Sequence, residues 1–256
     1  MLYDTHLHTI PFSTDSGMVF SEVQKERKAQ GLGLVLTEHM DYGFPPFDFD
    51  PDEYFKAYSP YRSDTLLLGV ETGFTADARE MNRSLVRSHP FDMVIGSVHA
   101  VGGRDLYEDG CFSQFADKEE AFCVYLETII ENIRDYDDFD TLGHIDYICR
   151  VAPYPDPLLH YSEYGDAIDT ILRILADREQ SLEINTRLFA NTEAVASLEE
   201  ICRRFEDLGG RTVTVGSDAH RAEVIGNYLT AAYGLAETCG LAPVYYRERK
   251  KYPVTQ

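Results

Sequence analysis

The sequence predicts a single α/β domain built around parallel strands, and three observations support this. Apolar, strand-like segments alternate with segments of helical periodicity along the chain. Seven strand-like segments, separated by helical or irregular crossovers and followed by a closing helix, are typical of parallel strands with right-handed connections. The length of 256 residues is typical of one α/β barrel. We find no linker, low-complexity segment or internal repeat, so residues 1–256 are expected to form one domain.

The expected strands are short apolar runs, and each leads into polar residues. In chain order they cover residues 2–8, 34–37, 65–70, 91–98, 141–145, 181–185 and 211–216. The expected helices cover residues 21–30, 77–88, 118–135, 162–178, 192–208 and 223–239. Ser21 is the expected N-cap of the first helix, with Gln24 completing a capping box. The pair Gly209-Gly210 is expected to end the sixth helix. The barrel should occupy about residues 1–235, followed by a C-terminal tail over about 240–256.

Two stretches break the alternation. Residues 42–63 are rich in aromatic residues, proline and aspartate, and only their middle could hold a helical turn. Residues 101–117 contain three glycines and show no clear period. Long irregular loops in a compact domain are usually functional or disordered. Because both loops leave strand ends that carry candidate metal ligands, we expect them to form lids over a site.

The composition excludes several classes of partner. A formal net charge of −21 repels phosphodiester backbones, so nucleic acid is not an expected partner. No apolar run approaches the roughly 20 residues of a membrane span, and the N-terminus lacks the pattern of a signal peptide. Five cysteines without regular spacing do not suggest a disulfide framework. These features predict a protein of the reducing cytoplasm.

Residues able to bind metal ions gather at the ends of the expected strands. His6 and His8 are two apart on a strand and therefore point to the same side. An isolated His-x-His is usually a pair of polar residues on a solvated strand face. Here Asp15 follows in the next loop and six further candidates follow other strands, and the ends of parallel strands in a barrel meet at one mouth. The full set is His6, His8, Asp15, His39, Glu71, His99, His144, Asp218 and His220.

Imidazole and carboxylate groups together suit zinc, iron or manganese, and a carboxylate can bridge two such ions. The pattern therefore predicts a multinuclear metal site. Two histidines, His89 and His160, lie outside the pattern. For these two we expect only local packing or surface roles.

Several of these segments resemble the polymerase and histidinol phosphatase (PHP) superfamily. The segments are Asp4-Thr5-His6-Leu7-His8-Thr9, Thr37-Glu38-His39, Gly69-Val70-Glu71, Gly96-Ser97-Val98-His99, Gly143-His144-Ile145-Asp146, Glu183-Ile184-Asn185-Thr186 and Gly216-Ser217-Asp218-Ala219-His220. The resemblance runs over about residues 1–235 and is strongest to the monofunctional histidinol-phosphatase branch. It implies a distorted (β/α)7 barrel, similar to a TIM barrel, with a trinuclear metal centre.

The resemblance also implies how the ligands are shared among three ions. One ion would be bound by His6, His8, Glu71 and Asp218, the second by Glu71, His99 and His144, and the third by Asp15, His39 and His220. Glu71 would then bridge two ions. Glu38 or Asp146 is expected to orient a ligand imidazole through its other ring nitrogen.

The function implied by the resemblance is hydrolysis of L-histidinol phosphate, a step of histidine biosynthesis. A hydroxide held between two ions would attack phosphorus directly, with Glu71, Asp218 and His220 as catalytic residues. Arg150 and Arg187 are candidates to bind the phosphate, although both could be ordinary surface arginines.

Two departures from the family leave the substrate open. Residues 187–189, which follow Thr186, and residues 100–115 differ from the pattern expected of histidinol-phosphatases. The alternatives are a phosphoesterase for another small-molecule or nucleotide phosphate and, less favoured, a metal-stabilised structural domain without turnover. The expected partner in the main hypothesis is a small phosphate monoester.

Overall fold

A parallel sheet forms the centre of the protein. The computed structural model describes residues 1–44 and 47–255. Seven strands follow one another in the sheet in chain order, and each pairs parallel to the next. They are β1 (Tyr3–Leu7), β2 (Gly33–Met40), β3 (Leu66–Gly73), β4 (Met93–Ser97), β7 (Thr141–Leu142), β8 (Ser181–Asn185) and β9 (Thr212–Gly216). The segment after β9 lies beside β1, because the His8 amide donates to the Ala219 carbonyl at 2.9 Å and the Asp218 amide donates to the His6 carbonyl at 2.8 Å. The predicted distorted (β/α)7 barrel is confirmed.

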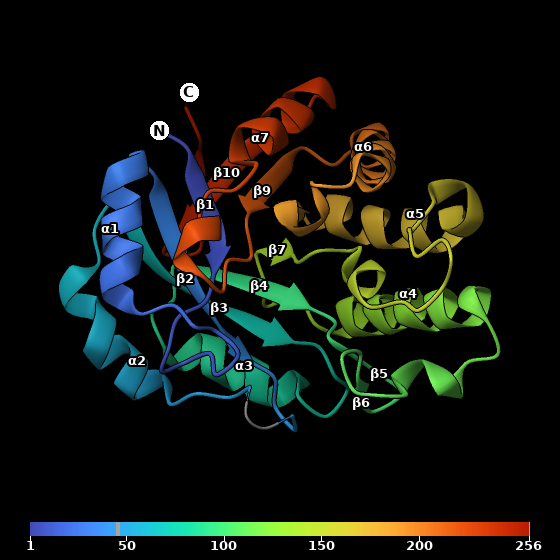
Figure 1. The fold of residues 1–256 in the computed structure, drawn as a ribbon, viewed down its shortest axis with the longest axis horizontal. Coiled ribbons are helices and arrows are strands. Elements are labelled where there is room, and N and C mark those ends of the chain that lie inside the picture. The colour runs from blue at the N-terminus through green and yellow to red at the C-terminus, as the bar shows by residue number, and fades with distance from the viewer. Residues whose placement is uncertain (45–46, 256) are drawn as a thin grey trace.

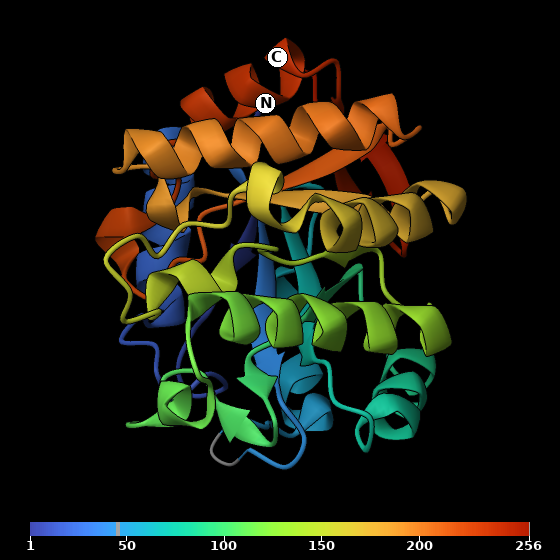
Figure 2. The same cartoon turned by 90° about the vertical axis from the view of Figure 1, so that its right-hand side faces the viewer.

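Helices cover the outside of this barrel. They are α1 (Phe20–Gln30), α2 (Pro51–Tyr58), α3 (Arg79–Ser88), α4 (Lys118–Asp135), α5 (Tyr161–Asp177), α6 (Thr192–Asp207) and α7 (Leu229–Thr238). Short 3₁₀ turns occur at Ser59–Tyr61, Cys111–Gln114, Tyr147–Arg150, Thr186–Leu188 and Ala222–Val224. Figure 2 shows α4, α5 and α6 side by side along one flank. Across the described residues, no helix is both long and apolar enough to cross a membrane.

The inward face of the barrel has two layers. Alternate residues of a strand point to the same side. Val35, Leu67, Met93 and Ile95 point inward near the start of β2, β3 and β4, and they form a small apolar cluster with residues of β10 (Ala242–Arg247). Further along the same strands, the inward side chains become polar and include Glu71. The apolar layer therefore forms a floor under a polar mouth.

Several predicted boundaries needed correction. Ser21 is not the N-cap of α1: the helix begins at Phe20, and the Glu22 carboxylate accepts a hydrogen bond from the Val19 amide at 3.0 Å. The helix expected at 223–239 begins only at Leu229, because the preceding residues form a 3₁₀ turn and a loop in which Tyr228 has a φ of 57°. Gly209, with a φ of 102°, ends α6 as expected.

The segment expected as a C-terminal tail contains regular structure. Residues 242–253 form two strands, β10 and β11 (Lys250–Pro253). Strand β10 pairs parallel to β9, and β11 pairs antiparallel to β10. This segment is thus an integral part of the sheet and contributes to the floor of the barrel.

The two irregular loops contain short elements. The first includes α2, which Asp50 caps by accepting hydrogen bonds from the amides of Asp52 and Glu53. Residues 45 and 46 of that loop lie outside the described residues. The second loop includes a small hairpin of β5 (Ala100–Val101) and β6 (Arg104–Asp105). Figure 1 shows the hairpin beyond the arrowheads of β3 and β4.

Candidate metal centre

The carboxyl ends of the strands open into a cavity of about 810 Å³. Six of the nine candidate ligands line it: Asp15, His39, His99, His144, Asp218 and His220. The other three, His6, His8 and Glu71, are fully buried beneath them. The parallel barrel therefore brings together all nine residues that the sequence pattern singled out, although they lie up to 214 positions apart.

Glu71 on β3 lies at the centre of this cluster. Its Oε1 is 2.8 Å from His144 Nε2 and 3.0 Å from His99 Nε2. Its Oε2 is 2.9 Å from His39 Nδ1 and 3.2 Å from His6 Nε2. Burial alone would raise the pKa of Glu71, but the surrounding imidazoles outweigh this effect and hold the pKa well below its ordinary value. The carboxylate is thus kept charged with its two oxygens directed at different histidines.

A second part of the cluster joins the first strand to the segment after β9. His8 Nε2 lies 3.3 Å from Asp218 Oδ1 and 3.6 Å from Glu71 Oε2. His6 Nε2 lies 3.8 Å from the same Asp218 oxygen. Gly216 allows this close approach, because a Cβ at that position would come within 2.3 Å of the His6 Cβ. These contacts are compatible with the expected grouping of His6, His8, Glu71 and Asp218.

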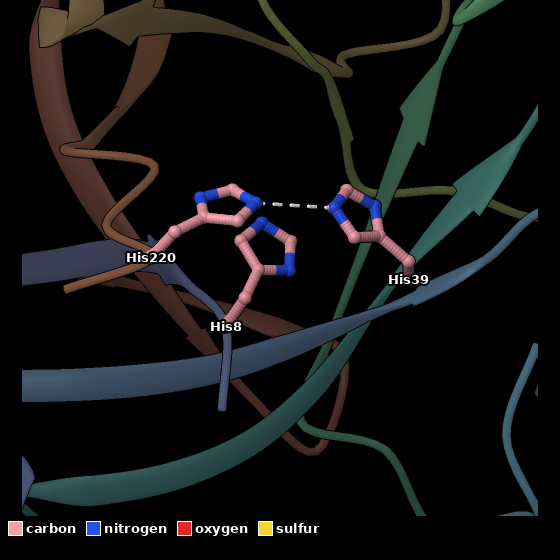
Figure 3. Close-up of side chains that lie close together, drawn as sticks. All are labelled: His8, His39 and His220. Carbon is pink, nitrogen blue, oxygen red and sulfur yellow. Dashed lines mark hydrogen bonds between the residues drawn. The ribbon is translucent and has the colours of Figure 1, made fainter. Parts of the chain in front are cut away.

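The third part lies at the mouth of the cavity. His220 Nε2 is 3.0 Å from Asp15 Oδ2 and 3.4 Å from His39 Nε2. Figure 3 shows the rings of His39 and His220 pointing toward one another, with the His8 ring beside them. The Asp15 side chain is 37% exposed, so this group faces solvent more than the others. Asp15, His39 and His220 thus form the outer part of one continuous cluster.

The donor atoms fit bound metal ions. His6 Nε2, His8 Nε2, His39 Nδ1 and Glu71 Oε2 are buried without a hydrogen-bond partner. Leaving such groups unpaired in a protein interior costs about 1–3 kcal/mol each, so natural proteins rarely tolerate several together. Overlapping sets of three side chains place possible ligand atoms within 4.8 Å of one another. Nitrogen and carboxylate oxygen donors at this spacing suit zinc, iron or manganese.

Two carboxylates orient the histidines, and neither is one that the sequence pattern predicted for this role. Glu183 Oε1 lies 2.7 Å from His6 Nδ1, and Asp41 Oδ1 lies 2.9 Å from His99 Nδ1. Each carboxylate holds a proton on Nδ1 and leaves Nε2 directed at Glu71. Burial raises the pKa of Glu183, but the contact with His6 more than offsets this and the pKa is lowered. Glu183 belonged to a recognised segment, and Asp41 is two residues from His39 on the same strand face.

The expectation that Glu38 or Asp146 orients an imidazole directly is wrong for the described residues. Glu38 instead accepts hydrogen bonds from Thr9 and Ser13, which fixes the loop after β1. Burial raises the pKa of Glu38 to about 7 despite these hydrogen bonds. The Ser13 hydroxyl lies 3.4 Å from His8 Nδ1, so Glu38 reaches that ring only through Ser13. Asp146 is only partly buried and forms no direct hydrogen bond to a histidine ring in the described part of the chain.

Both candidate phosphate-binding arginines line the cavity. Arg150 donates to Asp218 Oδ2 at 2.6 Å and to Asn185 Oδ1 at 3.1 Å. Its side chain is only 7% exposed, so Arg150 is not an ordinary surface arginine. Arg187 is exposed and donates to the Asp218 carbonyl at 2.9 Å. The Arg150 guanidinium group therefore contacts the Asp218 side chain, and the Arg187 guanidinium group contacts the Asp218 backbone, beside the candidate ligands.

The remaining histidines lie elsewhere, as expected. The His89 ring stacks on Phe55 at a centroid distance of 6.0 Å. His160 pairs with Asp156 at 2.9 Å on the surface. Neither is among the residues that line the cavity.

The fold and the cluster together define a class of protein: a distorted α/β barrel with a cluster of candidate metal ligands at the carboxyl ends of its strands. The chain belongs to the PHP domain family, whose model matches residues 4–187. The resemblance deduced from the sequence segments is thereby confirmed.

Individual relatives cover almost the whole chain. It is 43% identical over 252 residues to a probable histidinol-phosphatase of Clostridium acetobutylicum, covering 97% of this chain and 98% of that protein. It is 33% identical over 228 residues to a histidinol-phosphatase of Lactococcus lactis, covering 86% and 84% respectively. A crystal structure of histidinol phosphate phosphatase from L. lactis, complexed with zinc, L-histidinol and phosphate, is similar with a TM-score of 0.91 and 31% identity, covering 98% of each chain.

Proposed function

We propose that this protein is a metal-dependent phosphatase that hydrolyses L-histidinol phosphate to L-histidinol and inorganic phosphate. One observation carries the proposal: its fold matches, over 98% of each chain, a histidinol phosphate phosphatase whose structure contains zinc, L-histidinol and phosphate. The ligand cluster and the two cavity arginines support the same chemistry. The enzyme would act in histidine biosynthesis, and five free cysteines agree with a reducing cytoplasmic location.

The proposed cofactor is a set of three divalent ions, either zinc, iron or manganese. The proposed ligand groups are His6, His8, Glu71 and Asp218; Glu71, His99 and His144; and Asp15, His39 and His220. When bound, such ions would neutralise phosphate charge and make a water molecule more acidic. The unpaired buried atoms of the cluster support this assignment, since each has the chemistry of a metal ligand.

The residues around the ligands would prepare the site for a phosphate monoester. Arg150 is held by Asp218 and Asn185, so its guanidinium group is already oriented at the edge of the cluster. We assign Arg150 and Arg187 to the phosphate oxygens, because guanidinium groups bind phosphate in a bidentate geometry. Fixing these groups before the substrate arrives reduces the entropic cost of orienting the phosphate.

Contacts at the Nδ1 atoms determine which ring nitrogen of these histidines carries the proton. Glu183 and Asp41 hold protons on Nδ1 of His6 and His99. His220 Nδ1 donates to the Asp218 carbonyl at 3.0 Å, which directs His220 Nε2 toward Asp15 and His39 at the mouth. We assign Glu71, Asp218 and His220 to catalysis because Glu71 lies at the centre of the candidate ligand cluster and the other two line the cavity beside it.

A substrate panel tests this function. L-histidinol phosphate, p-nitrophenyl phosphate and adenosine monophosphate should be compared by kcat/KM, with metal content measured on the same preparation. We expect histidinol phosphate to be hydrolysed most efficiently. More efficient turnover of either other ester would refute the proposed substrate, and absence of turnover with all three by metal-loaded protein would refute the phosphatase.

A further inference from the structure

A β-hairpin directly follows the candidate ligand His99 in the sequence. Strands β5 and β6 follow His99, and the two residues between them, Gly102 and Gly103, have φ values of 60° and 77°. A two-residue turn with both residues at positive φ suits the twist of a hairpin and favours glycine. The Leu106 amide then donates to the His99 carbonyl at 3.0 Å, and the Leu106 side chain is buried. The hairpin is therefore held in a fixed position relative to His99.

This hairpin presents an acidic residue to the cavity. Asp105 lines the cavity, and its Oδ1 accepts a hydrogen bond from the Tyr107 amide at 2.7 Å. Three other acidic residues line the same cavity: Asp15, Asp41 and Asp218. Each of those three contacts an imidazole at a distance of 2.9–3.3 Å. Among the described residues, Asp105 forms no ion pair, so its negative charge is available to a ligand.

Aromatic rings connect Asp105 to the candidate metal ligands. The Tyr147 ring lies 4.8 Å from the His99 ring and 4.8 Å from the His144 ring, measured between centroids. The Tyr107 ring lies 5.9 Å from Tyr147, and Tyr107 is 56% exposed at the mouth. A flat heterocycle that enters this part of the cavity can pack on an aromatic surface, beside the Asp105 carboxylate.

We propose that Asp105 and Tyr107 form the subsite for a cationic leaving group. The Asp105 carboxylate would pair with the ammonium group of histidinol, and the Tyr107 ring would pack against its imidazole. This inference rests on the proposed function and specifies which residues distinguish the substrate from other phosphate esters. The phosphate, bound near Arg150 and Arg187, is common to all esters and cannot provide that selectivity.

The Asp105→Asn variant isolates the charge of this residue. Asparagine keeps an oxygen that accepts the hydrogen bond from the Tyr107 amide, so the turn is retained. Asp109→Asn is the matched control, because Asp109 is in the same loop, exposed and not among the cavity-lining residues. Tyr107→Leu tests the aromatic part. Metal content and thermal stability should equal those of the wild type in all three variants.

The readout is selectivity among three esters: L-histidinol phosphate, its analogue without the amine, and p-nitrophenyl phosphate. For Asp105→Asn, we expect kcat/KM to fall about 10- to 100-fold for histidinol phosphate, as for loss of one charged hydrogen bond. The two esters without an amine should change less than about twofold, a difference that also excludes general damage to the metal centre. Tyr107→Leu should weaken both imidazole-containing esters, whereas Asp105→Asn should weaken only the ester that carries the amine.

Two results would overturn the subsite. If the wild type prefers histidinol phosphate and Asp105→Asn retains that preference, the subsite is wrong and the proposed function stands. If the wild type shows no preference for histidinol phosphate over p-nitrophenyl phosphate, both the subsite and the proposed substrate are wrong.

Discussion

Replacing Glu71 by glutamine should disturb the whole cluster, because this residue touches more candidate ligands than any other. Four imidazole nitrogens lie 2.8–3.2 Å from its carboxylate oxygens, and Ser97 donates to Oε1 at 2.7 Å. The amide of glutamine would place a donor where one of these oxygens now accepts. Asp15→Asn is the comparison, since Asp15 belongs to the outer part of the cluster and is 37% exposed.

The size of the effect follows from burial. Removing one partner of a fully buried charged pair costs about 3–5 kcal/mol, whereas an exposed pair contributes at most about 1 kcal/mol. For a domain of this size, 1 kcal/mol corresponds to a change in Tm of about 2–4 °C. Chelator-treated Glu71→Gln should therefore melt roughly 6–20 °C below the wild type. Asp15→Asn should melt within about 4 °C of it.

Two measurements check this reasoning. Calorimetry of the metal-free proteins gives the change in Tm, and elemental analysis after reconstitution gives the equivalents of metal per chain. Glu71→Gln should lose metal from two of the proposed ligand groups, and Asp15→Asn from one. A Glu71→Gln protein with the Tm and metal content of the wild type would refute the central position of this carboxylate.

Three further outcomes are expected. Protein purified without chelator and reconstituted with manganese, iron and zinc should bind at least about two equivalents of metal, and removing them should abolish turnover; fewer equivalents would contradict a multinuclear site. Asp41→Asn should weaken metal binding about 10–100-fold by freeing the His99 ring, and unchanged affinity in a competition titration would contradict this role. Asp169 has a pKa lowered by its hydrogen bonds from Arg204, which outweigh burial. The contribution of ionised Asp169 to folding stability should be present above the pKa that Asp169 has in the unfolded chain. It should disappear as pH falls through the pKa of Asp169 in the folded protein. Asp169→Asn should therefore cost about 1 kcal/mol at pH 7 and less near pH 2, as measured by urea unfolding. An equal cost at both pH values would exclude the charge as its source.

The candidate ligands could be predicted from the sequence because their positions follow from a simple regularity. Each lies in or just after a strand, and parallel strands end at one edge. His6 and His220 could therefore be assigned to the same site without knowledge of any contact between them. The floor of the barrel could not be predicted in this way. The residues of β10 were assigned to the C-terminal tail, because their alternation between partly and fully buried positions depends on β9 beside them.

The orienting carboxylates depended on side-chain geometry that spacing does not reveal. Glu38 is adjacent to His39 and Asp146 is two residues from His144, which made them reasonable candidates. Adjacent residues of a strand point to opposite faces, so Glu38 faces Thr9 and not the imidazoles. Asp41 shares the face of His39 and reaches His99, but this contact requires β2 and β4 to be brought together across β3. The Ser21 N-cap failed because Glu22 stabilises an earlier start of the helix.

The barrel interior has an apolar layer and a polar layer, so the site depends on which residues of each strand point inward. On β3, Leu67 and Glu71 point inward from the same strand, with Gly69 between them. A one-residue insertion upstream of Glu71 within this strand would exchange its inward and outward side chains. It would send a buried carboxylate into the layer of helices and bring an aliphatic side chain to the catalytic mouth. A change in loop length at either end of β3 would leave this alternation intact, whereas an insertion within the strand would reverse it.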